Sequence, residues 1–430
     1  MSKHARLGGP ARLILAGAAL AFLVAGVVSA QERTTDQILR FHQSRVAADP
    51  DDPLAHNRLA AAYVRKARES GDLAYYALAE QAAQHGLDLV ASGPAAATAN
   101  TLLASVHVAR HEFRQALSRA RAALDLNPAD LTPQAVAGDA LVELGDYEEA
   151  ARAYARLAPL TGPRHPTSRL AWLRFLQGDP PGAVALMRSA AATATTANPV
   201  GEPTAWTRAQ LGALLFHTGE LNGAEAAYRD ALVAMPRYHV ATAGLARVAA
   251  ARGRLREAAE HYRKALDVVP LPDYAAALGD VYTRLGREPE ARKQYALVEY
   301  IGRLSALNKT VYNRELALFL ADHDLRLPEA LELARKELEA RRDIYTYDVL
   351  AWALYKNGQA HEAQAAMSEA LRLGTQDARL LFHAGMIRRA LGEPDAARAA
   401  LARALALNPQ FHVLHAPVAA GVLVELKAGR

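Results

Sequence analysis

Apolar and small residues recur along this chain with a helical spacing, and the whole pattern then repeats after a fixed interval. The segments GELNGAEAAYRDALVAMP at 219–236 and GRLREAAEHYRKALDVVP at 253–270 place Gly, Ala, Tyr, Ala and Pro at the same positions. Their first residues, Gly219 and Gly253, are 34 residues apart. A period of this length is typical of arrays of helical hairpins. The pattern therefore predicts one pair of antiparallel helices per period.

The alanine at the sixth position of this segment marks the repeat along most of the chain. Small side chains at this place in the second helix let the two helix axes of a pair approach closely. Because one pair cannot bury its own apolar face, we expect the pairs to stack on one another. The anchor alanines are Ala77, Ala116, Ala150, Ala183, Ala224, Ala258, Ala291, Ala330, Ala363 and Ala397.

Glycine and proline indicate where the helices end. Gly219 is expected to end the first helix of its pair, since glycine adopts a left-handed conformation at little cost. Pro236 is expected to stop the second helix, because its ring cannot continue the hydrogen-bond ladder. The segments at 35–50 and 418–430 read as single helices that cover the two ends of the stack.

The longest interval between anchors separates Ala183 from Ala224 and contains AAATATTANPVGEP at 191–204. This segment has few large apolar residues and two prolines, so it is predicted to be an extended loop or hinge. The chain then divides into an amino-terminal array at 31–190, this loop, a carboxy-terminal array at 205–411 and a cap at 412–430.

The first 30 residues have the features of a targeting segment. Lys3, Arg6 and Arg12 precede the apolar run at 13–28, and Val-Ser-Ala follows at 28–30. This order is typical of a signal peptide, and cleavage after Ala30 would leave Gln31 as the first residue. The alternative is a retained membrane anchor within 13–30, at the short limit of a span. Either reading predicts an exported protein, periplasmic or extracellular.

The amino-acid composition limits the classes of partner and site that can be expected. The 430 residues include 50 Lys and Arg against 45 Asp and Glu, spread along the chain, so no basic stripe indicates nucleic-acid binding. Cysteine is absent, which excludes disulfides, thiolate metal sites and cysteine nucleophiles.

The repeated segments resemble tetratricopeptide repeats. The resemblance rests on QLGALLFHTGELNGAEAAYRDALVAMP, GLARVAAARGRLREAAEHYRKALDVVP and ALGDVYTRLGREPEARKQY, and it covers about residues 53–411. LAWALYKNG and LGTQDARLLFHAGMIRRALG are also similar to a family of exported bacterial tetratricopeptide proteins without established activity. The resemblance implies an all-α, right-handed superhelical solenoid of about ten hairpins with terminal capping helices.

The same resemblance implies a binding face. In the family, certain positions of the first helix of each repeat face a ligand on the concave surface of the superhelix. The alternative is that these large rings only fill the gaps between repeats. The matching residues here include Trp172, Phe175, Trp206, Phe216, His217, Arg284, Phe319, Tyr345, Trp352, Tyr355 and Phe382.

Signals of an enzyme are missing from the sequence. It contains no GxxxxGK[ST], GxGxxG, GxSxG or HExxH motif. Asp322, His323 and Asp324 form one cluster of metal-ligating residue types, and His412 and His415 form another. Neither has further ligands at a diagnostic interval, so capping of turns is the favoured explanation. We expect no catalytic residue, no metal ligand set and no cofactor.

These expectations favour a binding protein over an enzyme. The leading hypothesis is an exported scaffold that binds another protein or an extended peptide through its concave face, within a cell-envelope assembly. No nucleic acid is expected as a partner, and a membrane only through an uncleaved amino-terminal segment. The alternative hypothesis is a protein that handles a small ligand or a metal through the cluster at Asp322, His323 and Asp324.

Overall fold

The computed structural model describes residues 34–161, 167–307 and 313–428. The predicted signal peptide or anchor at 1–30 lies outside these residues. Every regular element within the described ranges is an α-helix. In the same ranges, no helix combines the length and the apolar character needed to cross a bilayer.

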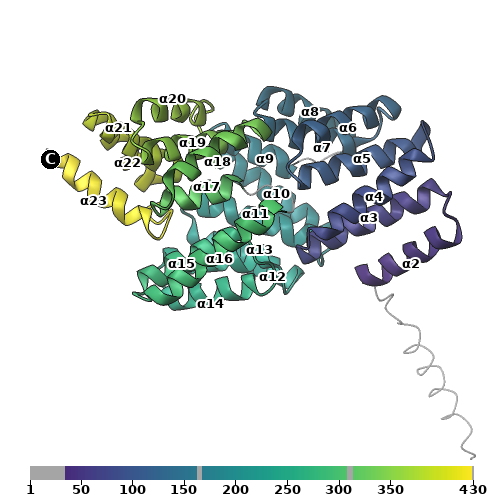
Figure 1. Cartoon of the computed structure of the whole chain (residues 1–430), viewed down its shortest axis with the longest axis horizontal. Helices are drawn as coiled ribbons and strands as arrows, with labels where there is room; N and C mark the ends of the chain where they lie inside the picture. Colours follow the sequence, from purple (N-terminus) through teal and green to yellow (C-terminus); the bar gives the residue numbers. More distant parts are fainter. Residues whose placement is uncertain (1–33, 162–166, 308–312, 429–430) are drawn as a thin grey trace, which may run out of the picture.

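In the described part of the chain, ten helical hairpins follow one another between two single helices (Figure 1). The single helices are α2 (Thr35–Ala48) and α23 (His415–Lys427). The hairpins pair an odd-numbered first helix with an even-numbered second helix, which confirms the predicted all-α solenoid. They are α3 (Pro53–Ser70) with α4 (Ala74–Asp88), α5 (Gly93–Ala109) with α6 (Phe113–Leu126), α7 (Leu131–Leu144) with α8 (Tyr147–Thr161), α9 (Thr167–Leu176) with α10 (Pro180–Ala197), α11 (Glu202–His217) with α12 (Leu221–Ala234), α13 (His239–Ala251) with α14 (Leu255–Leu266), α15 (Pro272–Arg284) with α16 (Glu288–Leu307), α17 (Asn313–Asp322) with α18 (Leu327–Ala340), α19 (Ile344–Lys356) with α20 (Ala360–Ala370), and α21 (Ala378–Ala390) with α22 (Pro394–Leu407).

The turns between helices follow the glycine and proline pattern of the sequence. Gly145, Gly178 and Gly219 follow the first helices of their hairpins with φ angles of 81°, 80° and 78°. This left-handed conformation costs a residue with a Cβ atom more than it costs glycine. In the fifth hairpin, α12 ends at Ala234, two residues before Pro236.

Nine of the ten anchor alanines, from Ala116 to Ala397, are fully buried. The prediction was wrong for Ala77, which is exposed. In α4 the buried face is formed by Ala79, Ala82 and Ala83, which recur at helical spacing and leave Ala77 on the opposite side. Ala79 is therefore the anchor of the first hairpin.

Small residues in the first helix explain the close packing inside each hairpin. A Cβ atom added to Gly212 in α11 would lie 2.7 Å from the ring of Tyr228 in α12. A tyrosine of the second helix lies over a glycine of the first in the same way at Gly138 and Tyr154. A larger side chain at these glycines would force the two helices of the hairpin apart.

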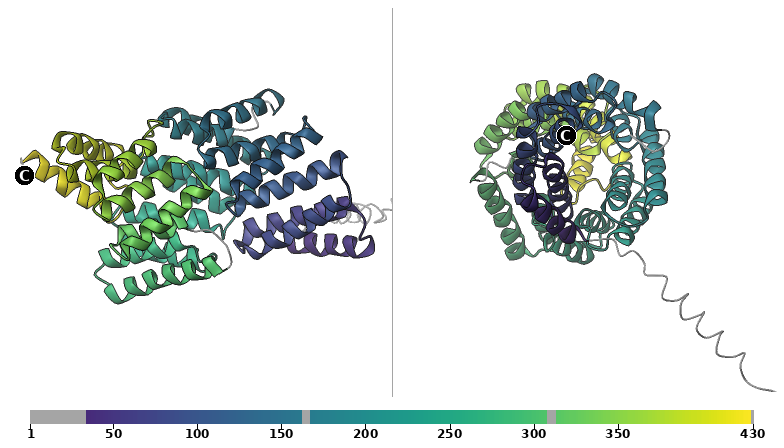
Figure 2. Two further views of the ribbon diagram at one scale, coloured as in Figure 1. Left: turned by 45° about the horizontal axis from the view of Figure 1, so that its top comes forward. Right: turned by 90° about the vertical axis from the view of Figure 1, so that its right-hand side faces the viewer.

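The stack of hairpins curves into a superhelix that forms a ring when viewed along its axis (Figure 2, right). First helices of successive hairpins pack against one another, as in the pairs α3 with α5, α11 with α13 and α17 with α19. Neighbouring helices approach most closely on the inner side of a curved stack, because that side is shorter. The first helices therefore form the concave face.

The superhelix also closes on itself, because hairpins from successive turns are in direct contact. Side-chain hydrogen bonds join Arg341 to Glu143, Thr375 to the carbonyl of Leu176, and Asn408 to the carbonyl of Phe216. The bonded residues are 192 to 199 residues apart in the sequence. The turns inside the third to fifth hairpins thus dock against the loops that follow the eighth to tenth hairpins.

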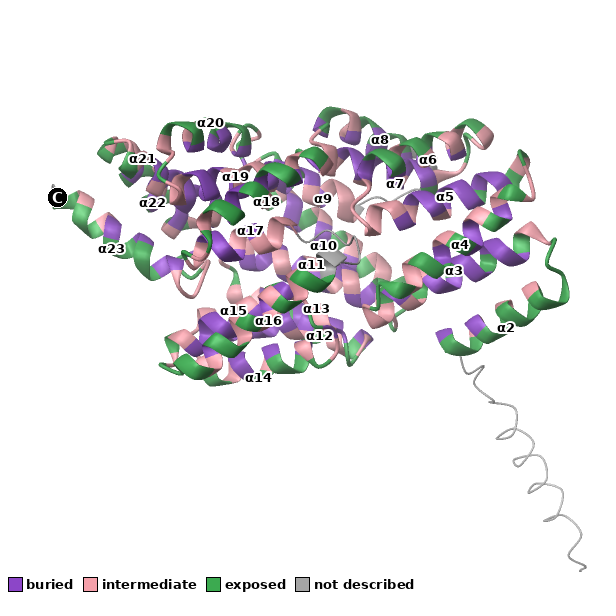
Figure 3. Ribbon diagram, viewed as in Figure 1, coloured by how far each residue is buried: buried purple, intermediate pink, exposed green. Residues whose placement is uncertain are grey.

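The loop predicted at 191–204 is shorter than expected. Helix α10 continues to Ala197 and α11 begins at Glu202, so only residues 198–201 lie outside helices. The small residues of this segment extend the helix because alanine is a strong helix former, and the buried Ala191 joins one core cluster with residues of both α9 and α13. Buried and exposed residues alternate along the helices of the stack (Figure 3), but residues 192–203 include none that is buried. A hinge motion here stays a prediction.

Candidate functional site

Backbone hydrogen bonds mark the place where the two turns of the superhelix meet, which we call the inter-turn junction. The N–H group of Arg342 donates to the carbonyl of Glu143 at 2.9 Å. The N–H group of Ile344 donates to the hydroxyl of Tyr147 at 2.8 Å. Because Ile344 is the first residue of α19, its N–H group has no partner within its own helix. The other turn supplies that partner.

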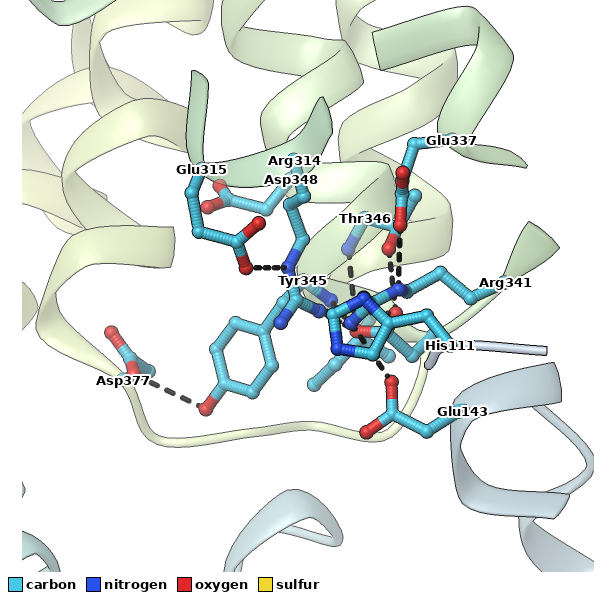
Figure 4. Close-up of polar contacts among 12 residues, drawn as sticks. His111, Glu143, Arg314, Glu315, Glu337, Arg341, Tyr345, Thr346, Asp348 and Asp377 are labelled. Atoms are coloured by element: carbon cyan, nitrogen blue, oxygen red, sulfur yellow. Dashed lines mark hydrogen bonds and ion pairs between the residues drawn. The ribbon is translucent and has the colours of Figure 1, made fainter. Parts of the chain in front are cut away.

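Arg341 is the central side chain of the inter-turn junction (Figure 4). Its Nε is 2.7 Å from Oε1 of Glu337, and the exposed fractions of the two side chains are 2% and 1%. From the other turn, Glu143 Oε2 lies 3.1 Å from Nη1, and His111 Nδ1 lies 2.7 Å from Nη2. The guanidinium also covers the ring of Phe113 at 5.1 Å. One buried arginine therefore connects α18 with the α5–α6 turn and α7.

Burial makes the carboxylates of this junction costly to ionise. The pKa of Glu337 is raised by burial, against which the charge of Arg341 acts. The pKa of Glu143 is raised by burial and by the nearby charge of Asp343. Removing Arg341 would leave both carboxylates without their main compensating charge.

A second contact between the turns combines three residues predicted to line the binding face with Asp377, which was not predicted. We call Trp172, His217, Tyr345 and Asp377 the Trp172 cluster. The rings of Trp172 and His217 meet edge to face at 6.3 Å. His217 Nδ1 lies 3.3 Å from Oδ2 of Asp377, and the hydroxyl of Tyr345 donates to the same oxygen at 3.4 Å. The cluster combines α9 and α11 with α19 and the N-cap of α21.

The predicted binding residues differ in their burial. Phe175, Phe216, Phe319, Trp352 and Phe382 are buried and belong to core clusters. Trp172, Trp206, His217, Tyr345 and Tyr355 are half-buried, and Arg284 is exposed. The five buried rings fill the gaps between repeats in this structure. The other six residues are more accessible, so they are the ones expected to contact a partner. That role stays a prediction.

The residues Asp322, His323 and Asp324 do not converge on one point, as a shared ligand site would require. Asp324 lies at the surface, with Oδ1 2.7 Å from Nζ of Lys356. His323 turns to Asp280 of α15, with Nε2 2.8 Å from Oδ1. Asp322 accepts a hydrogen bond from Nε1 of Trp352 at 2.7 Å. Successive residues at a helix end point in different directions, which separates the three side chains.

His323 and Asp280 form a buried ion pair. Nδ1 of His323 donates to the carbonyl of Phe319 at 2.7 Å, and Nε2 donates to Asp280. Burial alone would lower the pKa of His323, but the hydrogen bond to Asp280 raises it above its ordinary value. Both ring nitrogens therefore have a hydrogen-bond partner.

The two histidines after the last hairpin lie beside this pair. Burial lowers the pKa of His412 to about 4 and that of His415 to about 3, so both rings are neutral at neutral pH. The rings stack with their centroids 4.4 Å apart. His412 Nδ1 lies 3.3 and 3.4 Å from the N–H groups of Leu414 and His415, at the start of α23. His412 is thus a capping residue, as the sequence favoured.

Two buried residues of this region were not predicted from the sequence. His383 of α21 and Asp348 of α19 are both 0% exposed, and His383 Nδ1 lies 2.7 Å from Oδ1 of Asp348. The sequence offered a weak signal, since His383 lies among apolar and small residues, and the other buried residues of α21 carry no polar side chain. The pairing of the two requires knowledge of how α19 and α21 stack.

Comparison with known proteins supports the repeat assignment. A family model described as tetratricopeptide repeat matches residues 101–169, 136–199, 243–306 and 349–410. No curated protein matches the sequence. Similar solved structures include yeast Tom70, with 13% identity, 96% of each chain covered and a TM-score of 0.41. A tetratricopeptide repeat protein from Parabacteroides merdae has 17% identity, with 61% of this chain and 97% of that chain covered and a TM-score of 0.35.

The matched repeats and the architecture together assign the chain to a family. The matched segments include more than half of the 430 residues. They begin or end within the hairpins described above, whose glycine turns and buried anchor alanines are those of the repeated sequence. The chain belongs to the tetratricopeptide repeat family.

Proposed function

We propose that this protein is an exported scaffold that binds another protein or an extended peptide along the face formed by its first helices, within a cell-envelope assembly. A tetratricopeptide repeat superhelix is in general a non-catalytic scaffold for protein interactions. The partner's identity depends on the side chains that this scaffold presents.

The observation that carries the proposal is the Trp172 cluster. Half-buried aromatic side chains of α9 and α19 lie in one cluster although the two helices belong to different turns. Tryptophan and tyrosine supply large contact areas at low entropic cost, and the neighbouring His217 and Asp377 add hydrogen-bonding groups. A partner bound here would contact both turns at once.

Site-directed photo-crosslinking tests this proposal. A photoreactive phenylalanine analogue is placed at Trp172, Trp206 or Tyr355, each on a first helix, and the cells are irradiated before the envelope fraction is prepared. We expect the first-helix positions to give the same covalently linked partner. Excess unlabelled chain added to the extract before irradiation should reduce the yield, because a specific partner is saturable.

Val233 provides the matched control. It lies on the second helix α12 and its exposed fraction is 79%, so a probe there reports non-specific collisions. Adducts that form equally from Val233, or from Val233 alone, would place the interaction off the concave face. Amino-terminal sequencing of the chain recovered from the envelope tests export independently, with Gln31 expected as the first residue.

A further inference from the structure

Three potential metal ligands from distant hairpins meet inside the carboxy-terminal half of the superhelix. They are Asp322 at the end of α17, His383 in α21 and His415 at the start of α23. One ligand atom of each residue lies within 4.8 Å of the ligand atoms of the other two. We call these residues the Asp-His-His cluster.

His383 has the environment of a histidine prepared to bind a metal. Its Nδ1 pairs with the fully buried carboxylate of Asp348 at 2.7 Å, so Nδ1 is the protonated nitrogen. Its Nε2 is then an acceptor, and this atom is buried without a hydrogen-bond partner. A carboxylate behind one ring nitrogen and a bare opposite nitrogen is the arrangement seen around metal-ligating histidines.

The ring of His383 is also fixed in orientation. Trp352 stacks on it with ring centroids 4.1 Å apart and planes 12° from parallel. The same tryptophan donates from Nε1 to Oδ1 of Asp322 at 2.7 Å. One side chain thus holds two members of the cluster in place, which is the supporting role that outer residues play at metal sites.

His415 completes the cluster from the capping helix. Its Nε2 lies 3.7 Å from Oδ1 of Asp322, and its Nδ1 is buried without a hydrogen-bond partner. The ring is held between Phe382, at a centroid distance of 5.0 Å, and His412, at 4.4 Å. Nε2 is the nitrogen of His415 that lies beside Asp322, so it is the ligand atom that the cluster would use.

The neighbouring histidines are already used in other ways. Both ring nitrogens of His323 are occupied, Nδ1 by the carbonyl of Phe319 at 2.7 Å and Nε2 by Asp280 at 2.8 Å. His412 uses Nδ1 to cap α23, and its Nε2 lies 3.5 Å from Asp280. Within the described part of the chain, the available nitrogens beside Asp322 are therefore those of His383 and His415.

We propose that the Asp-His-His cluster binds one divalent transition-metal ion, with Zn²⁺ as the best match. Imidazole nitrogens with one carboxylate oxygen are typical ligands of Zn²⁺, at about 2.0–2.2 Å from the ion. A tetrahedral site with these bond lengths places its ligand atoms roughly 3.3 Å apart. The 3.7 Å between Asp322 and His415 is close to this value, and small side-chain rotations bring the third ligand inward.

A metal ion bound by the Asp-His-His cluster would hold the capping helix α23 against the eighth and tenth hairpins. Asp322 belongs to the eighth hairpin, His383 to the tenth and His415 to α23, so one ion joins three elements that are separate in the sequence. The binding free energy of an ion held only by the folded chain adds to the stability of the fold. We infer that Zn²⁺ stabilises the carboxy-terminal end of the superhelix.

Zn²⁺ titration of the full chain tests this proposal. The protein is prepared without a histidine tag, treated with a chelator and dialysed, and Zn²⁺ is then titrated in competition with a chromogenic chelator. We expect one equivalent to bind and the melting temperature to rise with Zn²⁺. Co²⁺ used in place of Zn²⁺ should give visible absorption of a site with nitrogen and oxygen ligands.

Substitutions assign the ligands. Asp322→Asn, His383→Gln and His415→Gln are each expected to weaken Zn²⁺ binding by roughly 100-fold or more, and Asp348→Asn by about 10- to 100-fold. The exposed His361→Gln variant should bind as the wild type does. Asp322→Asn keeps an oxygen that can accept from Trp352, so this variant is expected to stay folded.

Two results would overturn the proposal. One is a wild-type chain that takes up no equivalent of Zn²⁺ or Co²⁺ and whose melting temperature does not respond, which would indicate that a buried water pairs with these groups. The other is a folded Asp322→Asn variant that binds Zn²⁺ as tightly as the wild type.

Discussion

Replacing Arg341 with alanine is expected to lower the free energy of unfolding by about 3–5 kcal/mol, the usual effect of removing one partner from a buried ion pair. The arginine and Glu337 are both almost fully buried, 2.7 Å apart. Without the guanidinium, the carboxylate of Glu337 must either stay charged in the core or take up a proton. The α5–α6 turn also loses its contact with α18 through His111. Chemical denaturation followed by circular dichroism measures the change.

Two further variants separate the buried charge from the lost contact area. Arg398→Ala removes an exposed ion pair with Asp395, and we expect it to change stability by less than about 1 kcal/mol. Combining Arg341→Met with Glu337→Leu removes both buried charges at similar volume, and this variant should be more stable than Arg341→Ala. If Arg341→Ala were no more harmful than Arg398→Ala, the inter-turn junction would not contribute to stability.

Alanine in place of Gly178 or Gly219 is expected to destabilise the protein by about 1–3 kcal/mol more than alanine in place of Gly253 or Gly286, the usual cost of overpacking. All four glycines have φ angles between 70° and 80°, so alanine introduces a similar backbone strain at each of them. They differ in what a Cβ atom would meet. A Cβ atom on Gly178 would lie 2.5 Å from the carbonyl oxygen of Gly374. A Cβ atom on Gly219 would lie 2.8 Å from the carbonyl oxygen of Leu407.

The other two glycines are the internal control of this comparison. A Cβ atom at Gly253 or Gly286 would meet nothing within 4 Å. The difference between the two pairs therefore measures contact between successive turns of the superhelix, and thermal or denaturant unfolding of the four variants provides it. Equal destabilisation of all four would mean that the turns do not touch in solution.

Local features of the fold could be predicted because each depends on a few neighbouring residues. The Gly219 turn, the end of α12 before Pro236 and the buried Ala224 all follow from one repeated segment. Ala77 is the exception, because it is exposed. An irregular first hairpin moved the alignment by two residues, and only the buried face of α4 reveals the true anchor.

Contacts between turns could not be predicted, since they depend on the pitch that accumulates over several hairpins. Nothing near Arg341 in the sequence indicates that His111 and Glu143 will meet it. The same reason explains the histidine cluster. The sequence drew attention to Asp322 and to His415 separately, but His383 joins them only because α21 stacks between α19 and α23.

The hairpin stack closes on itself, turn against turn. Residue-resolved hydrogen exchange of the Arg342 and Ile344 amides tests this closure most directly, because both N–H groups donate to the other turn. Arg342 lies between α18 and α19, and Ile344 is the first residue of α19, so neither amide is protected by a helix of its own. The closed superhelix predicts slow exchange at both, with Tyr147→Phe releasing Ile344 alone. Exchange of both amides at the rate of unprotected residues, while the interior of α19 stays protected, would contradict it.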